Sequence, residues 1–174
     1  MSGSLVLIQE TTVSSGVSSV SLTGINSTYD VYKVVISGVK VSSDDAISIR
    51  VTKSGSADTS ANYDEAKLYL KSDGSSAQLA NENQTQIDFT ATVDSGVAAS
   101  NANGVGYLFN FPNSSEYSYV SLESAHFQYN DDTARGFYGG FVHTVASASD
   151  GVLFKTNTGQ NNTAGTFKLY GINK

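Results

Sequence analysis

The chain has 174 residues, of which only 15% are charged, with a formal net charge of −6 and no cysteine. This length fits one domain, residues 1–174, with a core that buries roughly 70% of the surface of the unfolded chain. The acidic balance and scattered basic residues argue against a surface for nucleic acid, and the missing cysteines exclude disulfides and thiolate metal sites. The early apolar run Leu5–Ile8 is too short for a secretion signal or a membrane span. We therefore expect a protein that is made in the cytoplasm and does not insert into a membrane.

Apolar and polar residues alternate along most of the chain, which is typical of strands with one buried face. In chain order, the predicted strands cover residues 5–9, 31–39, 45–53, 66–70, 86–93, 104–111, 117–129, 137–146, 152–156 and 166–172. Within them, Ile47, Phe89 and Phe167 are expected to face a dry interior. The stretch GVGYLFNF aligns Val105, Tyr107, Phe109 and Phe111 on one face.

Clusters rich in Gly, Asn, Asp and Ser separate these segments, as in SGSADTSAN, VDSGVAASNANG and NTGQNNTAG. Such residues reverse the chain readily. The pattern predicts an all-β fold, an antiparallel, jelly-roll-like β-sandwich of about ten strands, with little or no helix. At most, a helical turn or two is expected around Ala61–Ala66. The weakly charged strands at Leu5–Gln9 and Gly165–Asn173 must pair with each other or with another chain, and we expect a terminus in a subunit contact.

Few residues suggest chemistry. His126 and His143 fall in predicted strands, and a metal site needs a third ligand that the sequence does not indicate. The pairs Asp44-Asp45 and Asp131-Asp132 are expected to cap turns, while Glu65 and Asp88 flanking a glycosidic bond is the enzymatic alternative. Calcium stays open as a loop ligand, although no established ligand spacing is present. We expect no enzyme and no cofactor.

The ten tyrosines are the richest feature, because they offer large amphipathic contact surfaces. Tyr117 and Tyr119 share a strand face beside the PNSSE turn, and Tyr138 follows the NDDTARG turn. For Tyr29, Tyr107 and Tyr129 a half-buried strand position is favoured. The loops at Ser54–Asn62, Asp94–Asn103 and Thr156–Gly165 are candidates for ligand contact. The full set of interface candidates is Tyr117, Tyr119, Tyr138, Arg135, Asn101, Asn103 and Asn161.

Three motifs carry a resemblance to a known family. GINSTYDVY contains Ile25, Ser27, Thr28, Tyr29, Asp30 and Tyr32; a central strand ends in Phe109, Phe111 and Pro112; and GTFKLYG contains Gly165, Thr166, Leu169, Tyr170 and Gly171. In these places, and over nearly its whole length, the chain resembles single-domain virion proteins of tailed bacteriophages. The motifs are structural, and none is a catalytic or ligand signature.

The resemblance implies a β-sandwich on the outer surface of a virion, with capsid or tail proteins as partners. A capsid decoration protein that binds the shell through strand faces and loops is the first expectation. A tail-associated or fibre-tip module that recognises host surface glycans is the alternative. Because the predicted strands leave no separate attachment region, decoration is favoured. The resemblance also implies a homotrimer.

Overall fold

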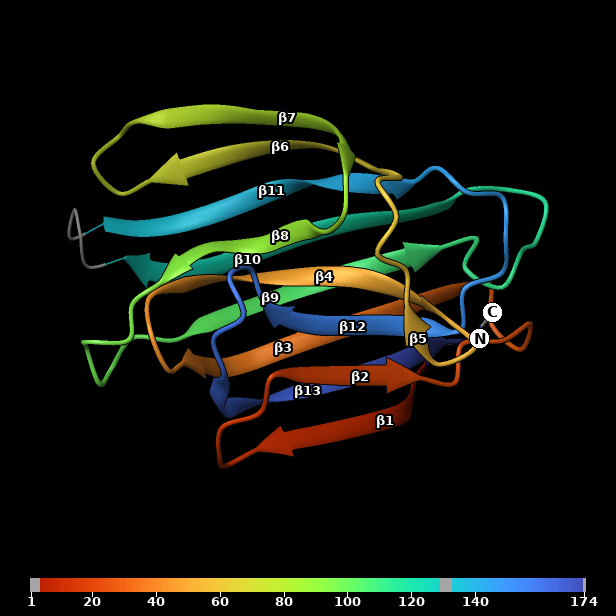
Figure 1. Ribbon diagram of the computed structural model, residues 1–174, viewed down its shortest axis with the longest axis horizontal. Coiled ribbons are helices and arrows are strands. Elements are labelled where there is room, and N and C mark those ends of the chain that lie inside the picture. The colour runs from red at the N-terminus through yellow and green to blue at the C-terminus, as the bar shows by residue number, and fades with distance from the viewer. Residues whose placement is uncertain (1–3, 129–132, 174) are drawn as a thin grey trace.

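The computed structural model describes residues 4–128 and 133–173, and these form two stacked antiparallel sheets (Figure 1). The larger sheet has eight strands in the order β1-β13-β3-β9-β10-β11-β6-β7, and the smaller has the order β2-β12-β4-β5, with β8 also paired to β4. The strands are β1 Leu5–Val13, β2 Ser19–Thr23, β3 Val31–Val41, β4 Asp45–Lys53, β5 Ser56–Ala57, β6 Tyr63–Lys71, β7 Ser76–Gln84, β8 Ile87–Val93, β9 Ala102–Phe109, β10 Ser118–Gln128, β11 Thr133–His143, β12 Gly151–Thr156 and β13 Asn162–Ile172. The predicted all-β sandwich is confirmed.

The core lies between the two sheets. Ile47, Phe89 and Phe167 are all fully buried, so the expected sidedness of these strands is confirmed. Phe154 joins the layers at the centre: its ring lies 5.4 Å from that of Phe89 and 5.5 Å from that of Phe167, centroid to centroid. Edge-on and tilted aromatic contacts of this kind add to the stabilisation from burial alone.

Strand β4 departs from simple alternation, because both of its faces are covered. Ser48 and Thr52, which strict alternation with Ile47 and Val51 would place on a solvent-facing side, are fully buried. Their hydroxyls donate to carboxylates of neighbouring segments, Ser48 Oγ to Asp88 at 2.9 Å and Thr52 Oγ1 to Asp150 at 2.6 Å. A buried hydroxyl is tolerated where it is hydrogen-bonded.

Other boundaries also differ from the sequence-based expectation. The helical turn around Ala61–Ala66 is wrong, since β6 begins at Tyr63. Strands β2, β5 and β7 were not predicted. Tyr129 and the Asp131-Asp132 pair lie outside the described residues. No helix among the described residues is long and apolar enough to cross a membrane.

The three family-like motifs converge at one end of the larger sheet. Tyr32 pairs with Gly171 on one side and with Leu108 on the other. Its hydroxyl donates to the Asn26 carbonyl at 2.5 Å, and its ring meets that of Tyr29 edge-on at 5.6 Å. The Tyr29 ring lies on Gly171 so closely that any side chain there would collide with it. These motifs therefore fix packing at the seam between β13, β3 and β9.

The two terminal strands, β1 and β13, pair with each other. This is one of the two arrangements expected from the sequence, the other being pairing with another chain. At a register shift between Leu7 and Gln9, the Gln9 side chain turns to the smaller sheet. Its amide donates to the Ser21 carbonyl at 3.1 Å and accepts from the Thr23 backbone N–H at 2.7 Å. Gln9 thus ties the β1 side of one sheet to the free edge of β2 in the other.

Candidate functional site

Large apolar side chains that remain exposed are gathered on one face of the molecule. Among the described residues they are Leu5, Leu7, Leu68, Leu70, Tyr107, Phe109, Tyr117, Tyr119 and Tyr138. The ladder registers place all of these except Tyr117 on the outer face of the eight-stranded sheet. We call this surface the outer face. Single exposed apolar residues are ordinary, but their concentration on one face makes that face the candidate interaction surface.

Cross-strand rows show how the outer face is built. One row runs from Phe109 through Tyr119 and Val142 to Asp64. The next runs from Tyr107 through Ser121 and Gly140 to Ala66 and Ala80. Since the second row carries small residues where the first carries large ones, the sheet surface sinks between β10 and β7.

The sunken region is a groove of about 790 Å³. Phe109, Tyr119 and Val142 form one wall, while Asp64, Asn81 and Glu82 form the other, over a floor that includes Gly140. Asp64 accepts the backbone N–H of Asn83 at 2.8 Å, which holds that carboxylate at the rim. The groove therefore offers an aromatic side and an acidic side, and the Asn81 amide turns away from it to donate to Glu65 at 2.7 Å.

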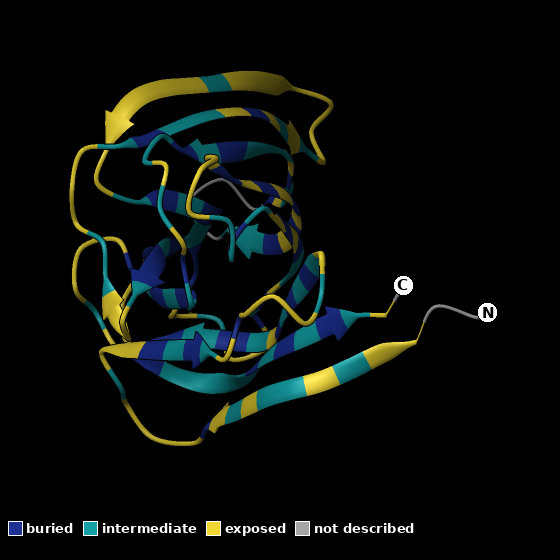
Figure 2. Cartoon of the chain, turned by 90° about the vertical axis from the view of Figure 1, so that its right-hand side faces the viewer, coloured by how far each residue is buried: buried dark blue, intermediate teal, exposed yellow. Residues whose placement is uncertain are grey.

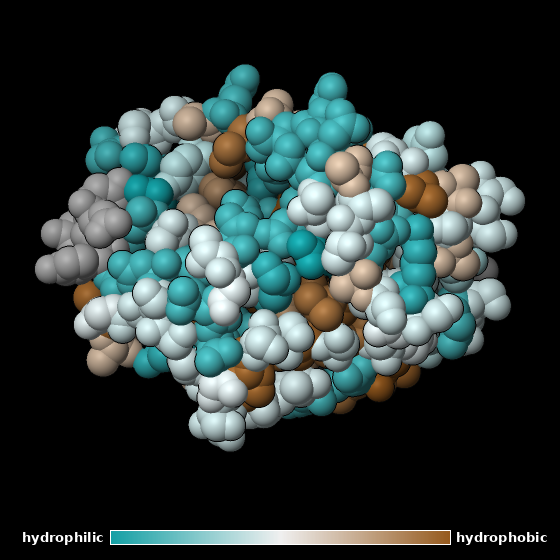
Figure 3. Space-filling model, in the orientation of Figure 1, coloured by the Kyte–Doolittle hydropathy of each residue, from teal (hydrophilic) through white to brown (hydrophobic). Residues whose placement is uncertain are grey.

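A second hollow of about 410 Å³ lies beside the first on the same face, between Tyr107 and Tyr138. Tyr138 is the most exposed of the large apolar residues, at 62%. The Lys33 ammonium lies 5.4 Å from the centre of the Tyr107 ring and holds that ring from one side. The five-stranded side, which faces the viewer in Figure 3, is by contrast mostly hydrophilic or neutral.

The three tyrosines proposed from the sequence as interface residues are all exposed. Tyr119 and Tyr138 lie on the outer face, and Tyr117 is exposed just before β10. Asn103 lies at the end of the same face, where its amide oxygen accepts the Gly38 N–H at 2.9 Å and its nitrogen donates to Asn101 at 2.7 Å. These two asparagines therefore hold the segment before β9 against β3.

The remaining predicted interface residues lie elsewhere. Arg135 points between the sheets, where its guanidinium lies 5.0 Å from the centre of the Tyr69 ring. Asn161 is tied to the β3–β4 turn through backbone and side-chain bonds with Ser42. Both are separate from the tyrosines of the outer face.

The three predicted ligand loops do not meet at one end. The loops at Asp94–Asn103 and Thr156–Gly165 approach the β3–β4 turn, through bonds of Ser95 to Asp44 and of Thr158 to Asp45. The loop at Ser54–Asn62 lies at the opposite end of the sandwich (Figure 1). The three loops therefore do not form one common site.

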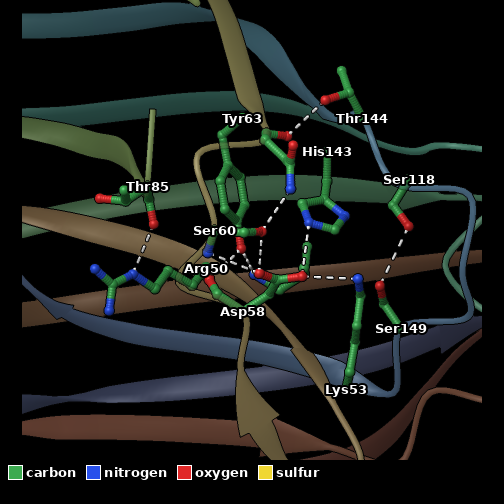
Figure 4. A network of polar contacts seen from close by, with 12 residues as sticks. Arg50, Lys53, Asp58, Ser60, Tyr63, Thr85, Ser118, His143, Thr144 and Ser149 are labelled. Carbon is green, nitrogen blue, oxygen red and sulfur yellow. Dashed lines mark hydrogen bonds and ion pairs between the residues drawn. The ribbon is translucent and has the colours of Figure 1, made fainter. Parts of the chain in front are cut away.

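Figure 4 shows a partly buried polar network that holds the Ser54–Asn62 loop. Asp58 Oδ2 lies 2.8 Å from the Lys53 ammonium and 3.2 Å from His143 Nε2. The Tyr63 hydroxyl donates to the Asp58 carbonyl at 2.8 Å. Burial alone would raise the pKa of Asp58, but hydrogen bonds from Lys53 and Ser60 hold that pKa well below its usual range.

His143 is fully buried, and its Nδ1 has no hydrogen-bond partner among the described residues. Burial lowers its pKa, and the nearby charge of Lys53 adds to this effect. A general base must reach a substrate proton, which this imidazole cannot do from inside the sandwich. The network therefore clamps a loop.

The two histidines are not neighbours. His143 pairs with Ser118 and His126 with Arg135, so they lie eight positions apart along the β10–β11 ladder. At ~3.3 Å per residue, that separation is about 26 Å and excludes a shared metal ion. No cluster of metal-ligating side chains occurs among residues 4–128 and 133–173.

The carboxylates considered for chemistry are engaged in the fold. Asp44 and Asp45 cap backbone N–H groups of Ser95, Ala46 and Thr158. Glu65 and Asp88 do approach a common group, the Lys67 ammonium, which lies 2.6 Å from Glu65 Oε2 and 2.5 Å from the Asp88 carbonyl. Lys67 is fully buried and neutralises Glu65. Burial raises the pKa of Asp88.

Sequence reasoning missed the leucines and the central aromatics of the outer face. Alternation groups Tyr107 and Phe109 on one strand face without assigning that face to the exterior, whereas the structure exposes both and turns Gly104, Gly106 and Leu108 inward. The Phe89 ring occupies the space above both glycines. The sequence signal was the alternation of two glycines with larger residues, because the glycine side of the strand is the side that packs against the Phe89 ring and the larger residues face solvent.

Comparisons with protein-family models, with curated proteins and with solved structures found no match.

Proposed function

We propose that the chain is a non-enzymatic structural protein of the bacteriophage exterior, a capsid decoration protein that docks through the outer face. The observation that carries the proposal is the concentration of eight exposed large apolar side chains on one sheet face. The resemblance of the three structural motifs supplies the virion setting.

The composition of the outer face supports docking to a protein. Tyr107, Tyr119 and Tyr138 combine apolar rings with hydroxyls that tolerate water before assembly, and tyrosine is enriched in protein interfaces. Charged groups are few and are partly neutralised, as in the 3.3 Å pair of Glu10 and Lys168. A rigid sheet also loses little entropy on binding.

The test uses purified protein and particles of the phage that encodes it, stripped of the endogenous protein. We expect stoichiometric rebinding to the capsid, located as added density in images of the particle. The double variant Tyr119→Asp/Tyr138→Asp places two carboxylates on the outer face and is expected to abolish rebinding. Ser19→Asp adds a carboxylate to β2, on the other sheet, and should bind normally. Normal rebinding by the double variant would refute docking through this face.

The groove favours one second candidate, a tail-associated module that binds host surface glycans. Aromatic rings such as Tyr119 stack on the apolar faces of sugars, while the Asp64 and Glu82 carboxylates on the opposite side of the groove accept hydrogen bonds from sugar hydroxyls. This candidate predicts that purified protein adheres to host cells and that the density lies at the tail tip. A capsid location without adherence would exclude it.

A further inference from the structure

The free edges of the two sheets are unequally protected. An unpaired strand edge is a template for another strand, and proteins normally cover it. Gln9 covers β2, and the buried ammonium of Lys67 takes the Asp88 carbonyl of β8. Strand β1 is interrupted by its register shift, and β5 has only two residues.

Strand β7 lacks such protection. It is nine residues long and pairs only with β6 among the described strands. All of its residues except Leu79 are exposed, as Figure 2 shows for the uppermost strand. Glu82 is its one charged residue, and it contains no proline. From Ser76 to Asn81 its ladder with β6 is regular, which leaves a straight outer edge.

We infer that β7 pairs antiparallel with β7 of a second copy of this chain, across a two-fold axis, so that two eight-stranded sheets become one. A two-fold axis perpendicular to the sheet keeps both outer faces on the same side. Outer-face residues must then meet outer-face residues, and the register centred on Leu79 satisfies this by pairing Gln78 with Ala80, both of which lie on the outer face.

This register is complementary in charge and size. It places Glu82 opposite Ser76, whose hydroxyl can donate to the carboxylate, and the long Gln78 beside the small Ala80. A parallel arrangement in register would oppose Glu82 to Glu82, which is unfavourable. The half-buried Leu79 meets its own copy at the axis.

The pairing also has a consequence for the outer face. Ala80, Asn81 and Glu82 of β7 line the groove, so the two grooves of a dimer lie on either side of the joint and face the same way. The β7–β7 contact relates two copies by a two-fold axis. A homotrimer would therefore have to use a different surface of the chain. The inference does not depend on the proposed function, since it concerns the isolated protein.

Two charge variants test the register by sedimentation equilibrium. Gln78→Lys/Ala80→Lys opposes like charges twice across the axis and is expected to raise the dimer dissociation constant about tenfold or more. Gln78→Lys/Ala80→Glu changes the same two exposed residues but opposes unlike charges, and should lower the constant or leave it unchanged. Equal constants for the two variants, or a monomeric wild-type protein, would overturn the inference.

Disulfide trapping gives a second readout, which is clean because the chain has no cysteine. Leu79→Cys places two thiols at the axis and is expected to form a covalent dimer on mild oxidation. Ser76→Cys, opposite Glu82 in this register, is the matched control and should stay monomeric on a denaturing gel. Crosslinking at 76 without crosslinking at 79 would contradict the pairing. The outer-face variants above should leave the dimer intact, so the two proposals fail separately.

Discussion

Replacing Gly104 by alanine tests how tightly the two sheets are packed. A Cβ at Gly104 would lie 2.6 Å from Cε1 of the Phe89 ring, 2.9 Å from the Glu123 carbonyl oxygen and 3.0 Å from Ser124 Cβ. Two of these three neighbours belong to strand β10, which cannot move away without breaking its ladder with β9. The ring or the strand must therefore shift.

Overpacking of this kind costs roughly 1–3 kcal/mol, while replacing glycine reduces the entropy of the unfolded chain and returns about 0.4–1 kcal/mol. We expect a net loss of about 1–2 kcal/mol in the free energy of unfolding. For a domain of this size, the loss lowers Tm by roughly 2–8 °C.

Gly106→Ala is the matched control in the same strand. There the nearest atoms are Val34 Cγ2 at 3.2 Å and a carbon of the Phe89 ring at 3.3 Å, so a small adjustment suffices and the stability should change by less than about 0.5 kcal/mol. Urea unfolding followed by circular dichroism measures both. Phe89→Leu in the Gly104→Ala background should recover part of the loss. Equal stability of the two glycine variants would refute the packing argument.

Three further perturbations probe buried polar groups. Glu65→Leu leaves the Lys67 ammonium without its 2.6 Å ion pair. It should lower the free energy of unfolding, measured in urea, by about 3–5 kcal/mol, and adding Lys67→Met should recover most of this loss. A loss below about 1 kcal/mol would contradict the argument. Burial lowers the pKa of His126 to about 4, so the neutral form is favoured in the folded state. Stability should therefore hold above pH ~6.5 and fall by about 3 kcal/mol as the pH drops from there to ~4; His126→Leu should flatten this decline, and an unchanged profile would exclude His126 as its source. Gln9→Ala removes the acceptor of the Thr23 N–H. We expect the free energy of unfolding to fall by about 1–2 kcal/mol and the Thr23 amide to exchange faster with solvent. Unchanged exchange would show that another group covers β2.

The fold class was predictable because most strands bury one face only. Ile47 and Phe167 could be assigned to the interior from alternation with polar neighbours, and the structure confirms both. Strand β7 could not be found in this way, since SAQLANENQ has a single large apolar residue, the half-buried Leu79, and therefore no alternation. Its assignment depends on pairing with β6, which is a tertiary effect that local periodicity does not contain.

The candidate site was predictable only in part. Tyr119 and Tyr138 could be selected because aromatic residues beside turns suggested contact. The leucines at 5, 68 and 70 carried no such signal, because their clustering follows from the order of strands in the sheet, β1 beside β13 and β6 beside β11. Long-range order of this kind is not encoded in any single segment.

The mismatch between eight strands and five has a dynamic consequence. Strand β7 lies at the margin of the larger sheet, where every residue except Leu79 is exposed, and it is held by one neighbour among the described strands. Its amides should exchange with solvent at free energies far below that of global unfolding, as a unit that detaches while the Phe89–Phe154–Phe167 stack stays closed. Strand β7 would then open and pair again with β6 while the rest of the fold stays intact. If β7 also pairs with a second copy of the chain, its protection against exchange should increase with protein concentration.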